Sequence, residues 1–202
     1  MQLPFYFDYA CPWAWLGSTR VERYFSDLGD RGVEVDYRPV HLATLREPAS
    51  GPAPKPGERK RRYYRADLLA WCEMVGVELS PDAGAVRPDT RLLLCAALVA
   101  KDAGRIRAFQ PLAYAARWAE ARDVADAEVV HELLGRAGLD ADRALEQAAS
   151  ETLRARLDAD TRAAIERGVF GVPTIFVGER MFWGNDRFEL VRHFLQKQQA
   201  PA

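Results

Sequence analysis

The chain has 202 residues, of which 49% are hydrophobic and 28% charged, an ordinary composition for one globular protein that buries its own core. A formal charge of −1 gives no bulk field for nucleic acid or an anionic membrane surface, and the longest apolar run, residues 92–100, is far too short to span a bilayer. The amino terminus lacks the basic stretch of a signal peptide, and three widely spaced cysteines form no disulfide framework, so we expect a protein of the reducing cytoplasm.

The chain opens with a predicted strand, helix and strand. Residues 2–8 are rich in aromatics and predict the first strand. Pro12 marks the first turn of a helix, where its missing N–H costs nothing, and apolar residues of helical period extend the helix to about Leu28. Residues 33–39 alternate between apolar and polar and predict the second strand, so this order favours a parallel pair.

A loop rich in proline and glycine follows at residues 47–57, with four prolines and two glycines. This composition excludes a helix or a central strand. A functional lid or linker and a surface excursion are both compatible with it.

Residues 58–168 read almost entirely as helix. Pro111 is expected to kink or restart the helix that it interrupts. Within these residues, glycines are expected at the C-terminal ends of helices and aspartates at their N-caps. These are Gly76, Gly104, Gly138 and Gly168, and Asp89, Asp126 and Asp140.

The chain ends with a predicted hairpin, residues 172–177 and 181–183 around Gly178, and a final amphipathic helix over residues 185–198. The element order predicts an α/β protein with a thioredoxin-like fold and a large all-helical insertion. The thioredoxin-like domain would be discontinuous, comprising residues 1–45 and 151–202, with residues 46–150 as the insertion.

Cys11 is the first candidate for chemistry. It lies between the first strand and the first helix, where free N–H groups and the positive end of the helix dipole favour a thiolate. Burial as a small packing residue is the alternative. Ala14 occupies the place of a second thiol, and Cys72 and Cys95 lie in apolar helical stretches that indicate inert packing.

The segment "GVPT" is the second candidate. Pro173 leads a strand and donates no ladder hydrogen bond. If the bond between Val172 and Pro173 is cis, the backbone of Val172 would be open to an extended peptide that pairs like an added strand. A trans proline in a loop is the alternative.

The segment "FWGNDR" is the third candidate. Asn185 or Asp186 could cap the last helix. Alternatively, the N–H groups here bind a carboxylate and Asp186 accepts from an ammonium group, as the zwitterionic end of a peptide would require.

Other residue patterns point to no further site. The basic run at residues 59–65 is best explained as a solvated helix face, with an anionic ligand second and nucleic acid last. The three histidines have no metal-ligand spacing, so no metal is expected.

Four segments together resemble the 2-hydroxychromene-2-carboxylate isomerases, relatives of the kappa-class glutathione transferases and of DsbA-type oxidoreductases. They are "FYFDYACPWAWLGS", the pattern formed by Lys60, Tyr63, Asp67, Leu68 and Trp71, "GVFGVPTIFV" and "MFWGNDR". The resemblance covers nearly the whole chain in order.

The resemblance implies a glutathione site. Cys11 would stand where the family usually has a serine that hydrogen-bonds the glutathione thiolate. Val172, before Pro173, would pair with the glutathione backbone, and Asn185 and Asp186 would hold its γ-glutamyl end. One expected contact is missing, because the family's asparagine after a glycine is absent from "SGPAPKPG".

The resemblance also implies the activity. The chain would be a glutathione-dependent isomerase of a conjugated aromatic acid in aromatic compound catabolism, working through a transient glutathione adduct, and would form a homodimer. The candidates for the substrate pocket are Trp13, Phe170, Trp183, Lys60 and Tyr63. The alternatives are a single-cysteine thiol–disulfide oxidoreductase or glutathione transferase of the DsbA/kappa type, and a thioredoxin-fold binding protein without catalysis.

Overall fold

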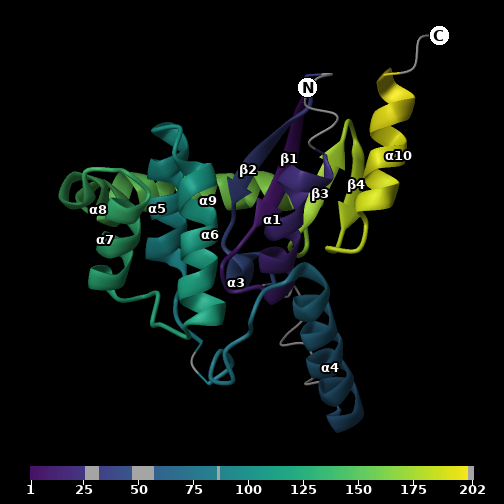
Figure 1. The fold of residues 1–202 in the computed structure, drawn as a ribbon. Coiled ribbons are helices and arrows are strands. Elements are labelled where there is room, and N and C mark those ends of the chain that lie inside the picture. Colours follow the sequence, from purple (N-terminus) through teal and green to yellow (C-terminus); the bar gives the residue numbers. More distant parts are fainter. Residues whose placement is uncertain (26–31, 47–56, 86, 200–202) are drawn as a thin grey trace.

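The computed structural model describes residues 1–25, 32–46, 57–85 and 87–199. Figure 1 shows a small central sheet with helices on both sides and α4 projecting away from the body. The elements, in chain order, are β1 (Gln2–Phe7), α1 (Pro12–Tyr24), β2 (Glu34–Pro39), α3 (Leu42–Leu45), α4 (Glu58–Val75), α5 (Arg91–Asp102), α6 (Ile106–Tyr114), the π-helix η1 (Ala115–Ala119), α7 (Ala127–Arg136), α8 (Ala141–Ala149), α9 (Glu151–Glu166), β3 (Thr174–Val177), β4 (Arg180–Trp183) and α10 (Phe188–Gln199).

The sheet joins the two ends of the described chain. Its strand order is β2-β1-β3-β4. β1 and β2 are parallel, with Gln2 opposite Glu34, whereas β3 is antiparallel to both β1 and β4. The predicted parallel pair and the predicted hairpin are therefore confirmed, as is a thioredoxin-like sheet with helices inserted between its halves.

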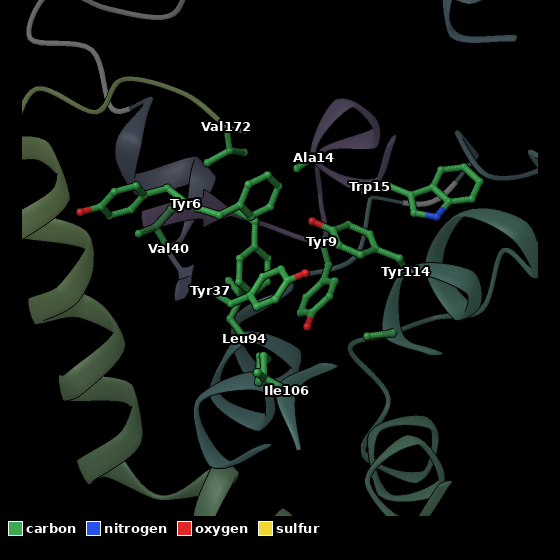
Figure 2. Packing of buried hydrophobic residues seen from close by; sticks show 14 of the residues in the cluster. Tyr6, Tyr9, Ala14, Trp15, Tyr37, Val40, Leu94, Ile106, Tyr114 and Val172 are labelled. Atoms are coloured by element: carbon green, nitrogen blue, oxygen red, sulfur yellow. The ribbon is translucent and has the colours of Figure 1, made fainter. Parts of the chain in front are cut away.

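Aromatic side chains from β1 and the segment after it form the centre of the core. Phe5, Phe7 and Tyr9 are fully buried. The Tyr9 ring meets Tyr114 of α6 with 4.7 Å between centroids, and Figure 2 shows the two rings together beneath Val172 and Ala14. Edge-to-face packing of this kind stabilises beyond the area that it buries. The end of β1 is thus held rigidly by the inserted helices.

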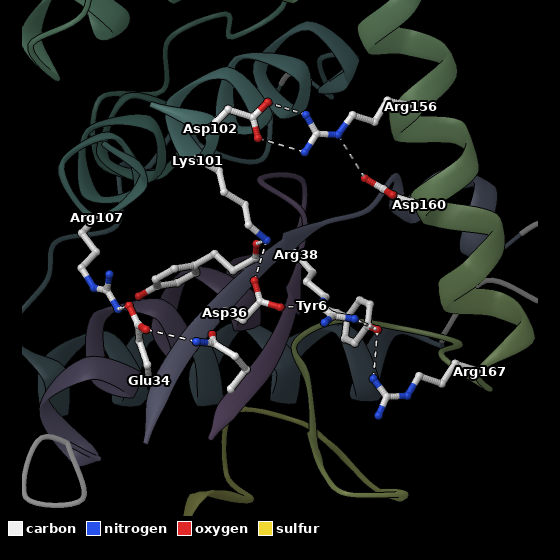
Figure 3. Close-up of polar contacts among 12 residues, drawn as sticks. Tyr6, Glu34, Asp36, Arg38, Lys101, Asp102, Arg107, Arg156, Asp160 and Arg167 are labelled. Atoms are coloured by element: carbon white, nitrogen blue, oxygen red, sulfur yellow. Dashed lines mark hydrogen bonds and ion pairs between the residues drawn. The ribbon is translucent and has the colours of Figure 1, made fainter. Parts of the chain in front are cut away.

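A polar network also connects β2 to the inserted helices. The carboxylate of Asp36 accepts from Lys101 of α5 at 2.5 Å and from Arg38 at 2.7 Å (Figure 3). Lys101 also donates to the backbone carbonyl of Tyr37 at 2.8 Å. These charge-assisted bonds hold α5 against β2.

Most predicted helix boundaries are confirmed. The four glycine stops all have positive φ, and Asp126 and Asp140 cap α7 and α8. Asp89 is not the cap of α5, because Thr90 holds that position while Asp89 accepts from the backbone N–H of Arg91 at 3.0 Å.

Several other boundaries differ from the prediction. The last helix begins at Phe188 and not at residue 185, and β3 begins at Thr174, two residues later than predicted. The first helix ends at Tyr24, and Leu28 lies outside the described residues, as do residues 47–56 of the proline-rich segment. The second strand begins at Glu34. α6 continues through Pro111 and passes into the π-helix η1, so the irregular hydrogen bonding appears four residues after the proline.

α9 packs on both parts of the molecule, contacting α5 and α8 as well as α3 and β2. The division of the chain at residues 45/46 and 150/151 therefore stays a prediction. Among the described residues, no helix has the length and apolar character needed to cross a membrane.

Candidate functional site

Cys11 lies at the junction of the β1 segment and α1. It is the N-cap of α1 with extended backbone angles, and Pro12 follows in the first turn. Its N–H donates to the carbonyl of Asp8 at 3.1 Å, while its own carbonyl accepts from the N–H groups of Ala14 and Trp15, both at 3.1 Å. The thiol of Cys11 therefore lies at the start of a helix, as the sequence predicted.

The thiol of Cys11 is buried and hydrogen-bonded in this structure. Its side chain is 3% exposed, and Sγ donates to the carbonyl of Val172 at 3.2 Å. Burial raises the pKa of Cys11 to about 11, although the backbone N–H groups of Ala14 and Trp13 act in the opposite direction. The expectation of a favoured thiolate is thus wrong here, because desolvation outweighs the helix start.

The segment "GVPT" lies directly against Cys11. The peptide bond between Val172 and Pro173 is cis. Val172 is 3% exposed, and its carbonyl accepts a hydrogen bond from Cys11. Because of this bond, the carbonyl is not open to an extended peptide. Pro173 packs on α1, where a Cβ added to Gly17 would come within 3.3 Å of Cγ of Pro173.

Asn185 and Asp186 are brought to the same region by a backbone bond. The N–H of Gly184 donates to the carbonyl of Pro173 at 2.9 Å. Asn185 is 5% exposed, and its side-chain nitrogen has no hydrogen-bond partner among the described residues. A buried amide donor of this kind is available to a ligand carboxylate.

Arg20 of α1 is a neighbour of this turn that the sequence did not single out. Its guanidinium donates to the carbonyl of Asn185 at 3.1 Å and lies over the rings of Trp71 and Phe188, at 4.9 and 5.0 Å from their centroids. It also interacts electrostatically with Asp186. One cation thereby fixes α1, α4 and the 185–186 turn relative to each other.

Phe170 and Trp183 form an aromatic pair beside "GVPT". Their centroids are 4.9 Å apart, and each side chain is about half exposed. A Cβ at Gly171 would come within 2.8 Å of the indole nitrogen of Trp183, so the ring lies across that glycine. Trp13 is half-buried at the start of α1. All three remain predicted pocket residues.

Lys60 and Tyr63 lie on the outer part of α4. Tyr63 is 65% exposed, and Lys60 sits over the ring of Tyr64. α4 meets α1 through Trp71, which is about 16 Å along the helix from Lys60 at 1.5 Å per residue. No contact among the described residues connects the two side chains to Cys11.

Asp8 is a buried acid that the sequence analysis did not select. Its carboxylate accepts from the N–H groups of Ala10 and Leu42 at 2.8 and 2.7 Å and from the hydroxyl of Thr90 at 2.8 Å. Burial raises the pKa of Asp8, partly opposed by these bonds. The available signal was its position at the end of a strand, three residues before a cysteine.

The arrangement combines a neutral thiol, a proline-led strand and a buried amide donor. Cys11, Val172, Pro173, Asn185 and Asp186 could hold a thiol-bearing peptide such as glutathione. No group of His, Cys, Asp or Glu among the described residues could hold a metal ion, and the three cysteines are all reduced.

Comparison with known proteins agrees with this geometry. Residues 2–196 match the DSBA-like thioredoxin domain. The chain is 31% identical over 196 residues to a 2-hydroxychromene-2-carboxylate isomerase of Sphingobium xenophagum, covering 96% of this chain and 97% of that protein. It is 30% identical over 190 residues to the same enzyme of Pseudomonas putida, covering 93% and 90%.

A solved structure carries the same name as these relatives. It is a 2-hydroxychromene-2-carboxylate isomerase with a TM-score of 0.82 and 27% identity, and the alignment covers 98% of this chain and 96% of that one. The agreement extends across the sheet and the inserted helices alike.

Proposed function

The chain belongs to the DSBA-like thioredoxin family and, within it, to the 2-hydroxychromene-2-carboxylate isomerase family, and from this premise we propose that it is a glutathione-dependent isomerase. Its substrate would be a conjugated aromatic acid, and the enzyme would act in the breakdown of aromatic compounds in the cytoplasm. When bound, glutathione would supply a thiolate nucleophile for reversible addition to the conjugated double bond; the π electrons would pass to the conjugated carbonyl on addition and return when the thiolate is eliminated after rotation.

The residues of the site fit glutathione by the kinds of group that they present. The buried side-chain nitrogen of Asn185 would donate to the α-carboxylate of the γ-glutamyl end, and Asp186 would accept from its ammonium group. Val172 would pair with the peptide backbone once its carbonyl is released by Cys11. These roles support binding of a short zwitterionic peptide at this end of the sheet.

The protonated thiol of Cys11 carries the proposal. A group with a pKa of about 11 is a hydrogen-bond donor at neutral pH. Turned from Val172 toward an incoming thiolate, it would stabilise that anion and lower the pKa of the bound thiol. The thiol would thus act in the role that the resemblance assigns to a serine hydroxyl.

A single-cysteine thiol–disulfide oxidoreductase, or a transferase of the kappa type, is the second candidate. Disulfide exchange requires Cys11 as a thiolate. The buried, protonated state of this thiol favours isomerisation over exchange, while the fold alone accommodates both. Covalent attachment of glutathione to Cys11 is the outcome that would separate them.

Isomerisation of a hydroxychromene carboxylate, followed by absorbance with and without reduced glutathione, tests the proposal. We expect turnover that depends on glutathione and is kept within about tenfold by Cys11→Ser, because a hydroxyl also donates to a thiolate. Cys11→Ala should lose about a hundredfold, since the donor is gone.

Two results would overturn the assignment. One is turnover of equal rate without glutathione. The other is a Cys11→Ser variant as inactive as Cys11→Ala, which would require a sulfur nucleophile at this position.

We further expect a homodimer, which sedimentation velocity would detect.

A further inference from the structure

A cavity of about 420 Å³ lies between α1, β2, the segment after α4 and the passage from α6 into η1. The lining residues that matter most are Trp15, Tyr37, Val77, Gln110, Pro111 and Ala115. None of the described residues that line it belongs to the candidate glutathione site. A volume of this size suits a small organic ligand.

Apolar side chains form much of the cavity wall. Trp15 of α1 is 4% exposed, so its indole is fixed by the packing around it. Val77, Pro111 and Ala115 add aliphatic surface. A wall of this kind favours a flat and largely apolar ligand, because binding removes the apolar area of its ring from water.

The charged groups of the lining disfavour an anionic ligand. Arg107 donates to the carboxylate of Glu22 at 2.8 Å, and the hydroxyl of Tyr37 hydrogen-bonds to the same carboxylate. Glu78 also lines the cavity, so two carboxylates accompany one guanidinium among the lining residues that the structure describes. A neutral ligand meets no net repulsion here, whereas a carboxylate or a phosphate does.

The hydroxyl groups of the lining on α1 already have protein partners. Ser18 donates to the carbonyl of Trp15 at 2.7 Å, and Thr19 donates to the carbonyl of Leu16 at 2.8 Å. Both bonds lie within the helix. These hydroxyls therefore do not determine which ligand the cavity accepts.

Gln110 of α6 differs from these groups. It lines the cavity and is 3% exposed, yet neither its side-chain nitrogen nor its side-chain oxygen has a hydrogen-bond partner among the described residues. Buried polar side chains in folded proteins are nearly always paired. A ligand that brings both a donor and an acceptor into the cavity would satisfy this amide.

We propose that this cavity binds a flat, neutral ring whose edge carries an N–H donor next to a carbonyl acceptor, as a lactam does, and that this edge pairs with the side-chain amide of Gln110. The amide nitrogen would donate to the ring carbonyl, and the amide oxygen would accept from the ring N–H. Glutamine makes the same kind of two-bond pairing with adenine. The last torsion of the side chain is broad, so the amide can turn toward the ligand.

Calorimetry with isoquinolin-1(2H)-one, a bicyclic lactam, tests the proposal. Its N-methyl derivative is the control ligand, because it keeps the ring and the carbonyl but lacks the N–H. Gln110→Leu removes an unpaired buried amide at similar volume, so this variant is expected to fold. Gln147→Leu, at an exposed glutamine of α8 outside the cavity, is the matched control. Ala115→Leu fills part of the cavity and leaves Gln110 in place.

We expect the lactam to bind at least about tenfold more tightly than its N-methyl derivative, and Gln110→Leu to lose at least about tenfold in affinity for the lactam. Gln147→Leu should bind the lactam like the unmodified chain, and Ala115→Leu should lose binding. Equal affinity for the two ligands, no binding of the lactam at millimolar concentration, or full affinity in Gln110→Leu or Ala115→Leu would overturn the proposal. The Ala115→Leu result decides the matter if Gln110→Leu does not fold.

A parallel titration with reduced glutathione shows whether the two sites are separate. Gln110→Leu should bind glutathione like the unmodified chain, because Cys11, Val172 and Asn185 are untouched. A loss of glutathione affinity in this variant would overturn the proposal of a second site. If the unmodified chain binds the lactam but not glutathione, the proposed function fails while the lactam site stands.

Discussion

The thiol of Cys11 experiences two opposing influences at the start of α1. The N–H groups of Ala14 and Trp13 favour a thiolate, whereas burial beneath Val172 disfavours it. The balance decides between a hydrogen-bond donor and a nucleophile. In this structure burial is the larger effect, and the side chain donates to a carbonyl.

The reactivity of Cys11 toward iodoacetamide should therefore rise only in strongly alkaline solution. With a pKa of about 11, Cys11 forms little thiolate until the pH is well above the pKa of an ordinary cysteine, about 8.5. Mass spectrometry of the peptide containing Cys11, after short exposures between pH 6 and 11, gives the midpoint. A midpoint at or below the ordinary value would support the oxidoreductase assignment instead.

The same pKa shift has a consequence for stability. Because the folded-state pKa lies above the unfolded value, the folded chain binds the proton more tightly. The stabilisation is complete below the unfolded pKa and is lost as the pH rises toward about 11. Cys11→Ser should remove this part of the pH dependence.

Individual candidate residues could be proposed from the sequence where a local motif contains them. Cys11, Val172, Pro173, Asn185 and Asp186 lie in short segments whose chemistry is visible in the sequence. Asp8 was not selected because its contacts come from partners far away in the chain. Its carboxylate accepts hydrogen bonds from Leu42 and Thr90.

At the scale of elements, α1 and the start of β3 pack closely at one glycine. A Cβ at Gly17 would lie 3.3 Å from Cγ of Pro173 and 3.4 Å from Cζ of Phe5. A helical glycine is otherwise unfavourable, so this one is explained by the close approach. Pro173 follows Val172, whose carbonyl accepts from Cys11.

Gly17→Ala and Gly135→Ala form a matched pair that measures the contact. Both glycines are helical, and alanine gains up to about 1 kcal/mol of helix propensity at each. At Gly135 the added Cβ meets Ala141 at an ordinary 3.6 Å, so we expect stabilisation in urea unfolding. At Gly17 the gain should vanish, and Gly17→Val should destabilise by about 1–3 kcal/mol.

Equal stabilisation by the two alanines would contradict this explanation of the contact. Gly17→Val should also weaken glutathione binding, because it shifts Pro173 away from α1. Unchanged glutathione affinity in a destabilised Gly17→Val variant would show that the packing of Gly17 against Pro173 does not affect glutathione binding.

The ends of helices could be predicted from the sequence where the capping residue lies at the end of the helix itself. Asp126, Asp140 and the glycine stops carry their own geometry. The passage from α6 into a π-helix was not predictable, since nothing in residues 115–119 demands the wider hydrogen-bond spacing. It places Trp118, whose indole N–H donates to the carbonyl of Tyr9 at 2.9 Å.

Across the whole molecule, the inserted helices hold the end of β1 in place. Tyr114 supports Tyr9, Trp118 bonds to the carbonyl of Tyr9, and Lys101 pairs with Asp36 of β2. The order of elements predicted this architecture. It could not predict which faces of the inserted helices meet at Cys11, because that depends on packing between segments distant in sequence.

The proposed function requires that glutathione bind beside Cys11 without a covalent bond. Calorimetry with reduced glutathione, followed by intact-protein mass spectrometry of the same sample, measures binding and covalent attachment together. We predict saturable binding at millimolar ligand or below, weakened at least about tenfold by Asn185→Ala, and a protein mass that is unchanged. An absence of heat at millimolar ligand, or a mass increase of one glutathione on Cys11, would rule out non-covalent binding of glutathione at this site.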